Sequence, residues 1–501
     1  MNITARIKKL LDTFFAGRRR SVAPFVLLNI FLILVEVLYI FSRYKYINSE
    51  IPFWFAKSWG DFQLSPKGHL YYLPATAFFL IVVAGSIRYV NRLYLRYFDE
   101  IVSYFVSIVN VFFFYSIYYI IQSASLPFPP FISAKFLTLV PPFTAAFFAI
   151  YVILPYFIDL AHWKRLVTDP GIHTHPAMLL REPSARGGGF VYAIIFLLLS
   201  ILFLGIGKQF QGIYLSVFML AILGIIDDFQ NTHPTSEFRV LENPFLRLLL
   251  LFLCVLPIIL SGLVVSTVSV PFDGFVELGK ISISVGSVSI PVVSAILTMV
   301  WVVWLMNALS WSNGIDGQFA GVIGISSIFV AILALRFEDL EPIHRSVAVM
   351  AAISAGAAFG FTKYTWYPSK IMWGFGAMAA GLVIAALSIA VQTKVLVSVL
   401  FILIPFLDAL VTFFRRIIQK KNPLSGDRGH LHHLLLDRGW SVQKIARFYW
   451  FTALAFGLIG LLSPERYMVK LSLTIIGAVG FFIALLNLRS LGQRNRKREA
   501  E

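Results

Sequence analysis

Two adjacent aspartates, Asp227 and Asp228, stand at the end of a long apolar segment in this 501-residue chain. Carboxylates at a helix C-terminus oppose the helix dipole, and two neighbouring carboxylates repel each other. A divalent cation would remove both conflicts, and Mg²⁺ binds carboxylate oxygens together with phosphates. We therefore expect a cation site here rather than a solvated helix end. Because neighbouring helix positions point about 100° apart, both aspartates could serve one site only where the helix unwinds.

Two further polar clusters also border apolar segments. The stretch PSARGGG, residues 183–189, offers the Arg186 guanidinium to a phosphate and glycines that let the backbone approach a ligand. A Gly-rich helix start is the alternative interpretation. The stretch NALSWSNGIDG, residues 307–317, carries Asn307, Asn313 and Asp316. A simple turn between helices would not require so many polar groups.

A fourth cluster, residues 422–440, holds His430, His432 and His433 close to Arg428. On one helix, His430 and His433 would share a face, and His432 would turn away. A zinc site would need further ligands, and the single cysteine of the chain, Cys254, lies in a distant apolar segment. We therefore expect this cluster to bind the phosphates of an anionic ligand.

The elements that carry these clusters are predicted to be transmembrane helices. The chain is 58% hydrophobic and only 13% charged, which excludes an ordinary soluble globular protein. Apolar segments long enough to cross a hydrocarbon core recur along it. We predict an all-α polytopic membrane protein with about fourteen transmembrane helices. They are expected near residues 22–42, 71–90, 101–122, 137–160, 187–206, 210–227, 244–266, 290–308, 317–336, 343–362, 371–391, 394–414, 447–464 and 468–488.

The net charge of +17 is explained by basic residues in short loops on one side of the membrane, so nucleic-acid binding is not expected. This distribution predicts cytoplasmic N- and C-termini in a plasma membrane, with all four clusters opening on the cytoplasmic side. The loop 266–289 alternates Val and Ile with Ser around glycines, which predicts a small extracytoplasmic β-hairpin. Glu36, inside the first apolar segment, is either a functional group or a helix-packing residue.

Together the clusters resemble those of the polyprenyl-phosphate N-acetylhexosamine-1-phosphate transferases, glycosyltransferase family 4. PSARGGG is similar to Pro-x-Pro-Arg-x-Gly-Gly, and the paired aspartates match those of the family. NALSWSNGIDG is similar to Asn-x-x-Asn-x-x-Asp-Gly-x-Asp-Gly, and DRGHLHH resembles the Asp-Arg-x-His-Leu-His-His stretch of the undecaprenyl-phosphate GlcNAc-1-phosphate transferase branch. The resemblance divides the chain into an N-terminal extension with about three helices (1–134), a transferase core with about eleven (135–489) and a basic cytoplasmic tail (490–501).

The resemblance implies transfer of a sugar 1-phosphate, expected to be a HexNAc 1-phosphate, from a UDP-sugar to a polyprenyl phosphate. It implies Mg²⁺, or Mn²⁺ in its place, on Asp228 and Asp316, with Asp227 as a further ligand or as a proton acceptor. The phosphates would be held by polar and cationic side chains, namely Arg186, Asn307, Asn313, Arg428, His430, His432 and His433.

One position departs from the family pattern. Relatives carry a metal-binding aspartate in a Met-Gly-Asp motif, whereas this chain has Gly374-Phe375. Phenylalanine cannot bind a hard cation. Either the remaining aspartates hold the metal in an altered arrangement, or the protein has become an inactive scaffold in envelope biosynthesis. A transporter is disfavoured because the polar residues gather on one face rather than at the membrane midplane.

Overall fold

The computed structural model describes residues 23–55, 63–90, 98–125, 134–171, 182–233, 239–270, 274–285, 288–336, 342–391, 395–422, 429–463 and 465–500. The chain forms two compact units, Met1–Phe148 and Ala149–Glu501, and each is described by itself. Within the described residues, nine helices are long and apolar enough to cross a membrane, and four shorter apolar helices accompany them. The prediction of an all-α polytopic membrane protein is confirmed.

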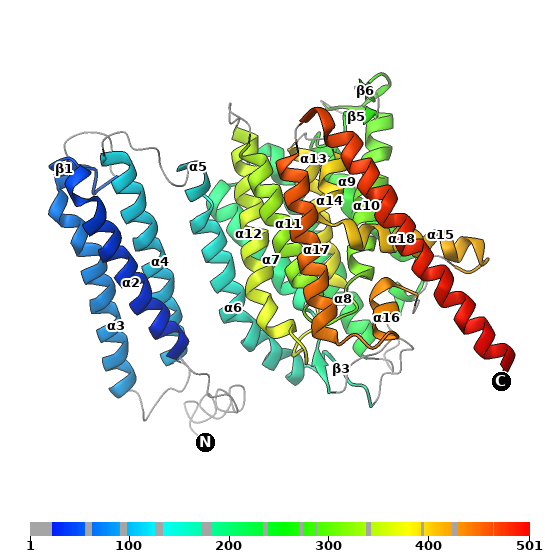
Figure 1. Ribbon diagram of the computed structural model, residues 1–501, viewed down its shortest axis with the longest axis horizontal. Helices are drawn as coiled ribbons and strands as arrows, with labels where there is room; N and C mark the ends of the chain where they lie inside the picture. The colour runs from blue at the N-terminus through cyan, green and yellow to red at the C-terminus, as the bar shows by residue number, and fades with distance from the viewer. Residues whose placement is uncertain are drawn as a thin grey trace. The chain divides into compact units, whose positions relative to one another are not determined.

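The first unit is built from three long helices with a pair of short strands (Figure 1). A buried polar chain joins α2 to α4, because Asn29 Nδ2 donates to Ser107 Oγ at 2.9 Å and Asn110 Nδ2 donates to the Asn29 carbonyl at 3.1 Å. Glu36 on α2 is fully buried, and neither of its carboxylate oxygens has a hydrogen-bond partner among the described residues. The elements are α2 (Ala23–Arg43), β1 (Glu50–Ile51), β2 (Ser65–Pro66), α3 (Tyr72–Val90), α4 (Phe98–Ala124) and α5 (Ala134–Leu137). Helix α6 (Val140–Trp163) crosses the boundary into the second unit.

The second unit is organised around α13 (Ala377–Ala390), all of whose residues are buried. A helix that is apolar on every side belongs inside a bundle. Accordingly, α13 contacts the helix that follows it in the chain and five helices that precede it. The five preceding helices are α7 (Gly188–Leu204), α8 (Lys208–Thr232), α10 (Val292–Trp311), α11 (Gln318–Ala334) and α12 (Pro342–Thr365). The remaining helices are α9 (Pro244–Leu260), α14 (Val395–Phe401), α15 (Leu403–Ile418), α16 (Leu431–Leu436), α17 (Val442–Leu462) and α18 (Glu465–Ala500).

Two details differ from the sequence-based expectation. The segment predicted as one helix over 394–414 is interrupted at Ile402, whose φ of −123° and ψ of 25° are not helical. Pro405 lies in the first turn of α15, where its missing N–H is tolerated. The loop 266–289 forms two hairpins rather than one: β5 (Thr267–Val270) with β6 (Gly274–Glu277), and β7 (Ser282–Val285) with β8 (Val288–Pro291).

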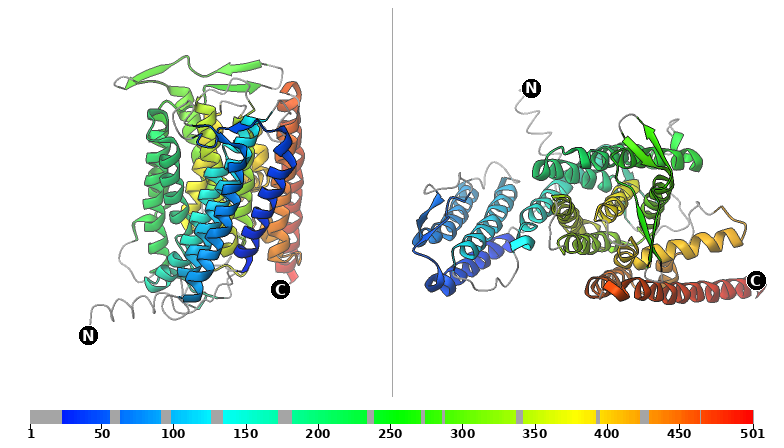
Figure 2. Two further views of the ribbon diagram at one scale, coloured as in Figure 1. Left: turned by 90° about the vertical axis from the view of Figure 1, so that its left-hand side faces the viewer. Right: turned by 90° about the horizontal axis from the view of Figure 1, so that it is seen from above.

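The hairpins mark one end of the second unit and the polar clusters mark the other. Figure 2 shows the strands projecting beyond the helix ends. Helix α16, which carries histidines of the fourth cluster, and the short strand β3 (Val167–Thr168), which pairs with the Gly-rich stretch, lie at the opposite end (Figure 1). Residues that are far apart in the sequence are thus brought to a single end of the bundle.

Candidate active site

Main-chain hydrogen bonds fasten the Gly-rich stretch to the segment around Phe375. Strand β4 (Ser184–Ala185) pairs with β3, and Ala185 forms a further bridge to Ile371. The N–H groups of Gly188 and Gly189 donate to the carbonyls of Met372 and Trp373 at 3.1 and 2.9 Å. A Cβ at Gly189 would overlap the backbone of Gly376, so this close approach requires glycine.

The side chain of Asp228 is fully buried against the segment around Phe375. Its Oδ1 accepts a hydrogen bond from the Phe375 N–H at 3.1 Å and lies 3.6 Å from Arg186 Nη1. Gly374 has a positive φ of 64°, and a Cβ there would overlap the Asp228 carboxylate. Asp228 Oδ2 is buried and has no hydrogen-bond partner among the described residues. One carboxylate oxygen therefore has its lone pairs available to a metal ion.

Asp227 faces a different set of partners. Arg247, in the first turn of α9, donates to Asp227 Oδ1 at 2.9 Å, and Asn231 Nδ2 donates to Oδ2 at 2.6 Å. The Arg247 guanidinium carbon also lies 5.4 Å from the centre of the Phe375 ring, within cation–π range. Arg247 was not identified from the sequence, where it reads as an ordinary basic residue at the start of an apolar segment.

These contacts correct the sequence-based view of the aspartate pair. Helix α8 continues to Thr232 and does not unwind at the aspartates. The two side chains therefore diverge, and each meets its own guanidinium group, Arg186 or Arg247. The charge conflict inferred from the sequence is thus relieved in part by two arginines.

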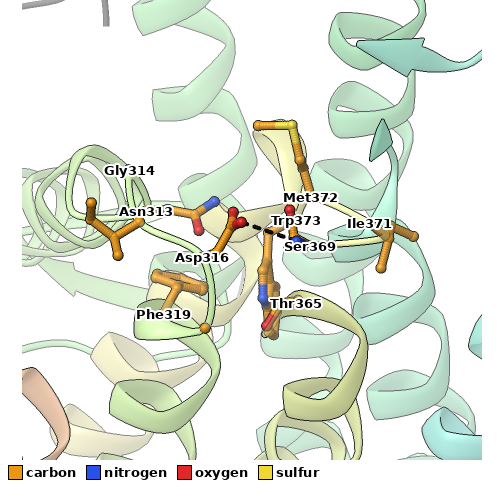
Figure 3. Close-up of a pocket in the computed structure, with 11 residues that line it drawn as sticks. Asn313, Gly314, Asp316, Phe319, Thr365, Ser369, Ile371, Met372 and Trp373 are labelled. Atoms are coloured by element: carbon orange, nitrogen blue, oxygen red, sulfur yellow. Dashed lines mark hydrogen bonds between the residues drawn. The ribbon is translucent and has the colours of Figure 1, made fainter. Parts of the chain in front are cut away.

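Asp316 lines a pocket at the turn between α10 and α11 (Figure 3). Its Oδ2 accepts a hydrogen bond from the Ser369 N–H at 3.0 Å. Burial raises the pKa of the Asp316 carboxyl, and the hydrogen bonds from Ser369 oppose that rise. Asn313 also lines the pocket. Asn307 instead donates its Nδ2 to the Val303 carbonyl one turn earlier in α10, at 2.8 Å.

The histidine cluster packs against the same turn. His432 is buried, and a Cβ at Gly314 would overlap its ring. The expectation that His432 turns away is wrong, because α16 begins only at Leu431 and leaves His430 in an extended N-cap conformation. The rings of His430 and His432 are consequently parallel, with centres 5.7 Å apart. Burial, together with the neighbouring His433 and His430, holds the pKa of His432 well below its usual range.

A buried aspartate supports the cluster from α15. Asp408 Oδ2 lies 3.0 Å from His430 Nδ1, and Asp408 Oδ1 accepts a hydrogen bond from the Leu431 N–H at 2.7 Å. An acidic residue inside an apolar segment was the sequence signal that could have identified Asp408. Arg415 donates to the Gly429 carbonyl at 3.1 Å and thereby braces the same loop. Arg428 lies outside the described residues.

Within the described residues, no three His, Cys, Asp or Glu side chains come together as a metal-binding group. A magnesium ion does not need such a group, since it retains waters and commonly binds one or two carboxylates with substrate phosphates. The unpartnered oxygen of Asp228 fits that mode of binding. Asp227 fits it less well, because both of its oxygens already accept hydrogen bonds.

Comparison with known proteins relates part of the second unit to phosphotransferases. Residues 210–392 match the model of glycosyl transferase family 4. The decaprenyl-phosphate N-acetylglucosaminephosphotransferase of Mycolicibacterium smegmatis is 28% identical over 39% of this chain and 54% of its own length. The chain therefore spans about half the length of the curated relative it matches there.

Two other relatives align over longer stretches. The probable undecaprenyl-phosphate N-acetylglucosaminyl 1-phosphate transferase of Bacillus subtilis is 26% identical over 56% of this chain and 72% of its own length. The phospho-N-acetylmuramoyl-pentapeptide-transferase of Clostridioides difficile is 23% identical over 64% of this chain and 95% of its own length.

Proposed function

Residues 210–392 belong to glycosyl transferase family 4, and from this premise we propose that the chain transfers a sugar 1-phosphate from a UDP-sugar to a polyprenyl phosphate. The products are a polyprenyl-diphosphate sugar and UMP, and the sugar is a HexNAc. A lipid-phosphate oxygen attacks the sugar-bearing phosphorus, and the bond from that phosphorus to the oxygen bridging the two phosphates breaks. The names of the Mycolicibacterium smegmatis and Bacillus subtilis relatives specify decaprenyl phosphate and undecaprenyl phosphate, and both specify an N-acetylglucosamine group.

The observation that carries the proposal is the buried Asp228 carboxylate, with one oxygen unpartnered and the other 3.6 Å from Arg186. A phosphotransferase must bring two mutually repelling phosphates together, so it needs cationic groups and an oxygen ligand for a metal. Arg186 is partly exposed and is fixed by a hydrogen bond of 2.5 Å from its Nε to Thr168 Oγ1. This bond leaves terminal guanidinium N–H groups for a phosphate.

The pocket beside Asp316 and the histidine cluster is proposed to hold the soluble substrate. Its lining combines Asn313 and Asp316 with the aromatic side chains Phe319 and Trp373. His430, His432 and Arg428 are proposed to bind the diphosphate, together with His433. The lipid tail would lie among the helices, which are apolar enough to cross a membrane.

Mg²⁺ is proposed as the cofactor, with Asp228 and Asp316 as its protein ligands. When bound, it would neutralise phosphate charge during the transfer. Asp227, held by Arg247 and Asn231, is proposed to support Arg247 rather than to bind the metal directly. We further propose that the site faces the cytoplasm of a plasma membrane, with both chain termini on that side.

The test uses the full-length protein, purified in detergent, with undecaprenyl phosphate, UDP-GlcNAc or another UDP-HexNAc, and either Mg²⁺, Mn²⁺ or a chelator. The expected result is a lipid-diphosphate sugar and an equal amount of UMP, both lost with the chelator. Glu242→Gln serves as a control, because Glu242 is an exposed acid of the same unit. Failure of the folded protein to convert any UDP-HexNAc would instead support the inactive-scaffold alternative.

A further inference from the structure

A buried carboxylate and a histidine form a pair at the base of the histidine cluster. Asp408 lies on α15 and is 1% exposed in its side chain, whereas His430 precedes α16 and is 11% exposed. Asp408 Oδ2 lies 3.0 Å from His430 Nδ1. Asp408 Oδ1 accepts a hydrogen bond from the Leu431 N–H at 2.7 Å. The two oxygens of this carboxylate therefore contact two consecutive residues of the loop, one oxygen each.

This geometry determines which nitrogen of His430 carries a proton. A carboxylate can only accept hydrogen bonds, so the short contact to Nδ1 requires an Nδ1–H. The second bond, from Leu431, prevents the carboxylate from rotating away. Among the described residues, no side-chain hydrogen bond reaches the other ring nitrogen, Nε2. Nε2 is thus the nitrogen that can contact a ligand.

The plane of the His430 ring is fixed as well. It is parallel to the His432 ring, with an interplanar angle of 1°, and its centre lies 6.5 Å from that of Trp311. His432 in turn packs on Gly314, in the turn that contains Asp316. The ring that Asp408 holds is therefore a neighbour of the pocket described above.

We propose that Asp408 is a positioning residue that keeps His430 protonated at Nδ1 and directs its Nε2 to a substrate phosphate. The proposal rests on the proposed function only for the identity of the ligand. With the phosphate bound, the ring carries both protons, Nε2–H donates to a phosphate oxygen, and Asp408 balances the charge. Hydrogen-bonded carboxylates behind functional histidines fix the tautomer and orientation of the ring in the same way.

Asp408→Asn tests this idea because an asparagine cannot reproduce both bonds. Its single carbonyl oxygen can accept from Leu431 or from His430, and its NH₂ group must face the other donor. If the oxygen stays with Leu431, the NH₂ group donates to Nδ1 and forces the proton to Nε2. Asp437→Asn is the matched control, because it makes the same change at the exposed far end of α16.

The first measurement is the ¹⁵N NMR spectrum of histidine-labelled protein, with His430→Gln used to assign the signal. We expect the Nδ1–H form of His430 in the wild type and in Asp437→Asn, and its loss in Asp408→Asn. This readout does not require turnover, so it distinguishes a failure of this proposal from a failure of the proposed function. An unchanged His430 signal in folded Asp408→Asn would overturn the proposal.

The second measurement is steady-state kinetics with UDP-GlcNAc and undecaprenyl phosphate varied in turn. We expect Asp408→Asn to lower kcat/KM by about 10–100-fold, the effect seen when a carboxylate that orients a metal-binding histidine is removed. The substrate whose KM rises identifies the phosphate that His430 contacts. Asp408→Asn should add no further loss to His430→Gln, because the two residues act as one unit. Losses that multiply in the double variant would contradict the proposal, since Asp408 would then act independently of His430.

Discussion

The guanidinium carbon of Arg247 lies 5.4 Å from the centre of the Phe375 ring, while its Nη2 donates to Asp227 at 2.9 Å. The aromatic side chain that replaces the expected aspartate thus holds a cation of the protein itself. An aspartate at position 375 would compete for that cation, whereas phenylalanine leaves it available to Asp227. Phe375, Arg247 and Asp227 thus form one group of contacting side chains.

Arg247→Ala is predicted to destabilise the protein because Asp227 would lose a charged hydrogen-bond donor. The expected loss in the free energy of unfolding is about 1–2 kcal/mol, since Arg247 is partly exposed. Denaturant unfolding followed by tryptophan fluorescence measures it. Arg239→Ala is the control, because Arg239 pairs with Glu242 in the open and should change nothing measurable. Equal losses in the free energy of unfolding for the two variants would contradict a stabilising contact between Arg247 and Asp227.

Gly374→Ala is predicted to be more damaging than Gly439→Ala. Both glycines have positive φ, 64° and 82°, so alanine costs about 1–2 kcal/mol of backbone strain at either position. Only at Gly374 would the new methyl group overlap Asp228, whereas nothing lies within 4 Å of a Cβ at Gly439. The Gly374 variant should lose a further 1–3 kcal/mol or so through overpacking. Thermal unfolding of the two variants separates these contributions.

Asp228→Asn is predicted to abolish turnover while the fold is retained. The asparagine carbonyl can still accept the hydrogen bond from the Phe375 N–H, but the negative charge beside Arg186 is removed. Initial rates of lipid-diphosphate sugar formation, compared with the thermal unfolding temperature, provide the measurement. Near-normal rates would refute the assignment of Asp228 to the metal.

Asp316→Asn is predicted to change stability in a pH-dependent way. Burial raises the folded-state pKa of Asp316 above its ordinary value of 3.8. The folded state therefore binds the proton more tightly, and this contribution to stability is complete below pH 3.8 and is lost as the pH rises through the folded-state pKa. Asparagine does not titrate and can still accept the Ser369 N–H. The stability of the wild type relative to Asp316→Asn should thus fall as the pH is raised from 4 towards neutrality, and a constant difference would be inconsistent with a raised pKa.

Glu36→Met is predicted to stabilise the first unit. Glu36 is fully buried with neither carboxylate oxygen partnered among the described residues, so an apolar side chain of similar length removes a desolvation penalty of about 1–3 kcal/mol. Asn29→Leu is the contrasting variant, since Asn29 bonds to Ser107 and Asn110 and its loss should lower the unfolding temperature. A fall in unfolding temperature for Glu36→Met would mean that the carboxyl has a partner that offsets its burial.

The sequence was sufficient to predict the helices and the membrane setting, because apolar segments of membrane-spanning length are a direct signal. It also singled out Asp228 and His430, which are buried, and Asp316, which is half-buried. The sequence did not predict which residues contact Asp227 and His430. Arg247 and Asp408 are 20 and 22 residues from the groups they contact, and only the packing of α8 on α9, and of α15 beneath the loop, brings each pair together. Helix periodicity likewise does not predict that His430 lies outside α16, where Asp408 contacts both His430 and the Leu431 N–H.

The frame around Asp228 is made of main chain, since Gly188, Gly189 and Ala185 bond to residues 370–373 through N–H and C=O groups alone. Gly189 and Gly376 meet backbone to backbone. No side chain at position 375 takes part in these bonds, because Phe375 reaches Asp228 through its own N–H. A mutation at this codon can therefore exchange an acid for an aromatic ring without rerouting the chain. The side chain at position 375 can therefore set the electrostatics of the centre while the backbone around Asp228 keeps its path.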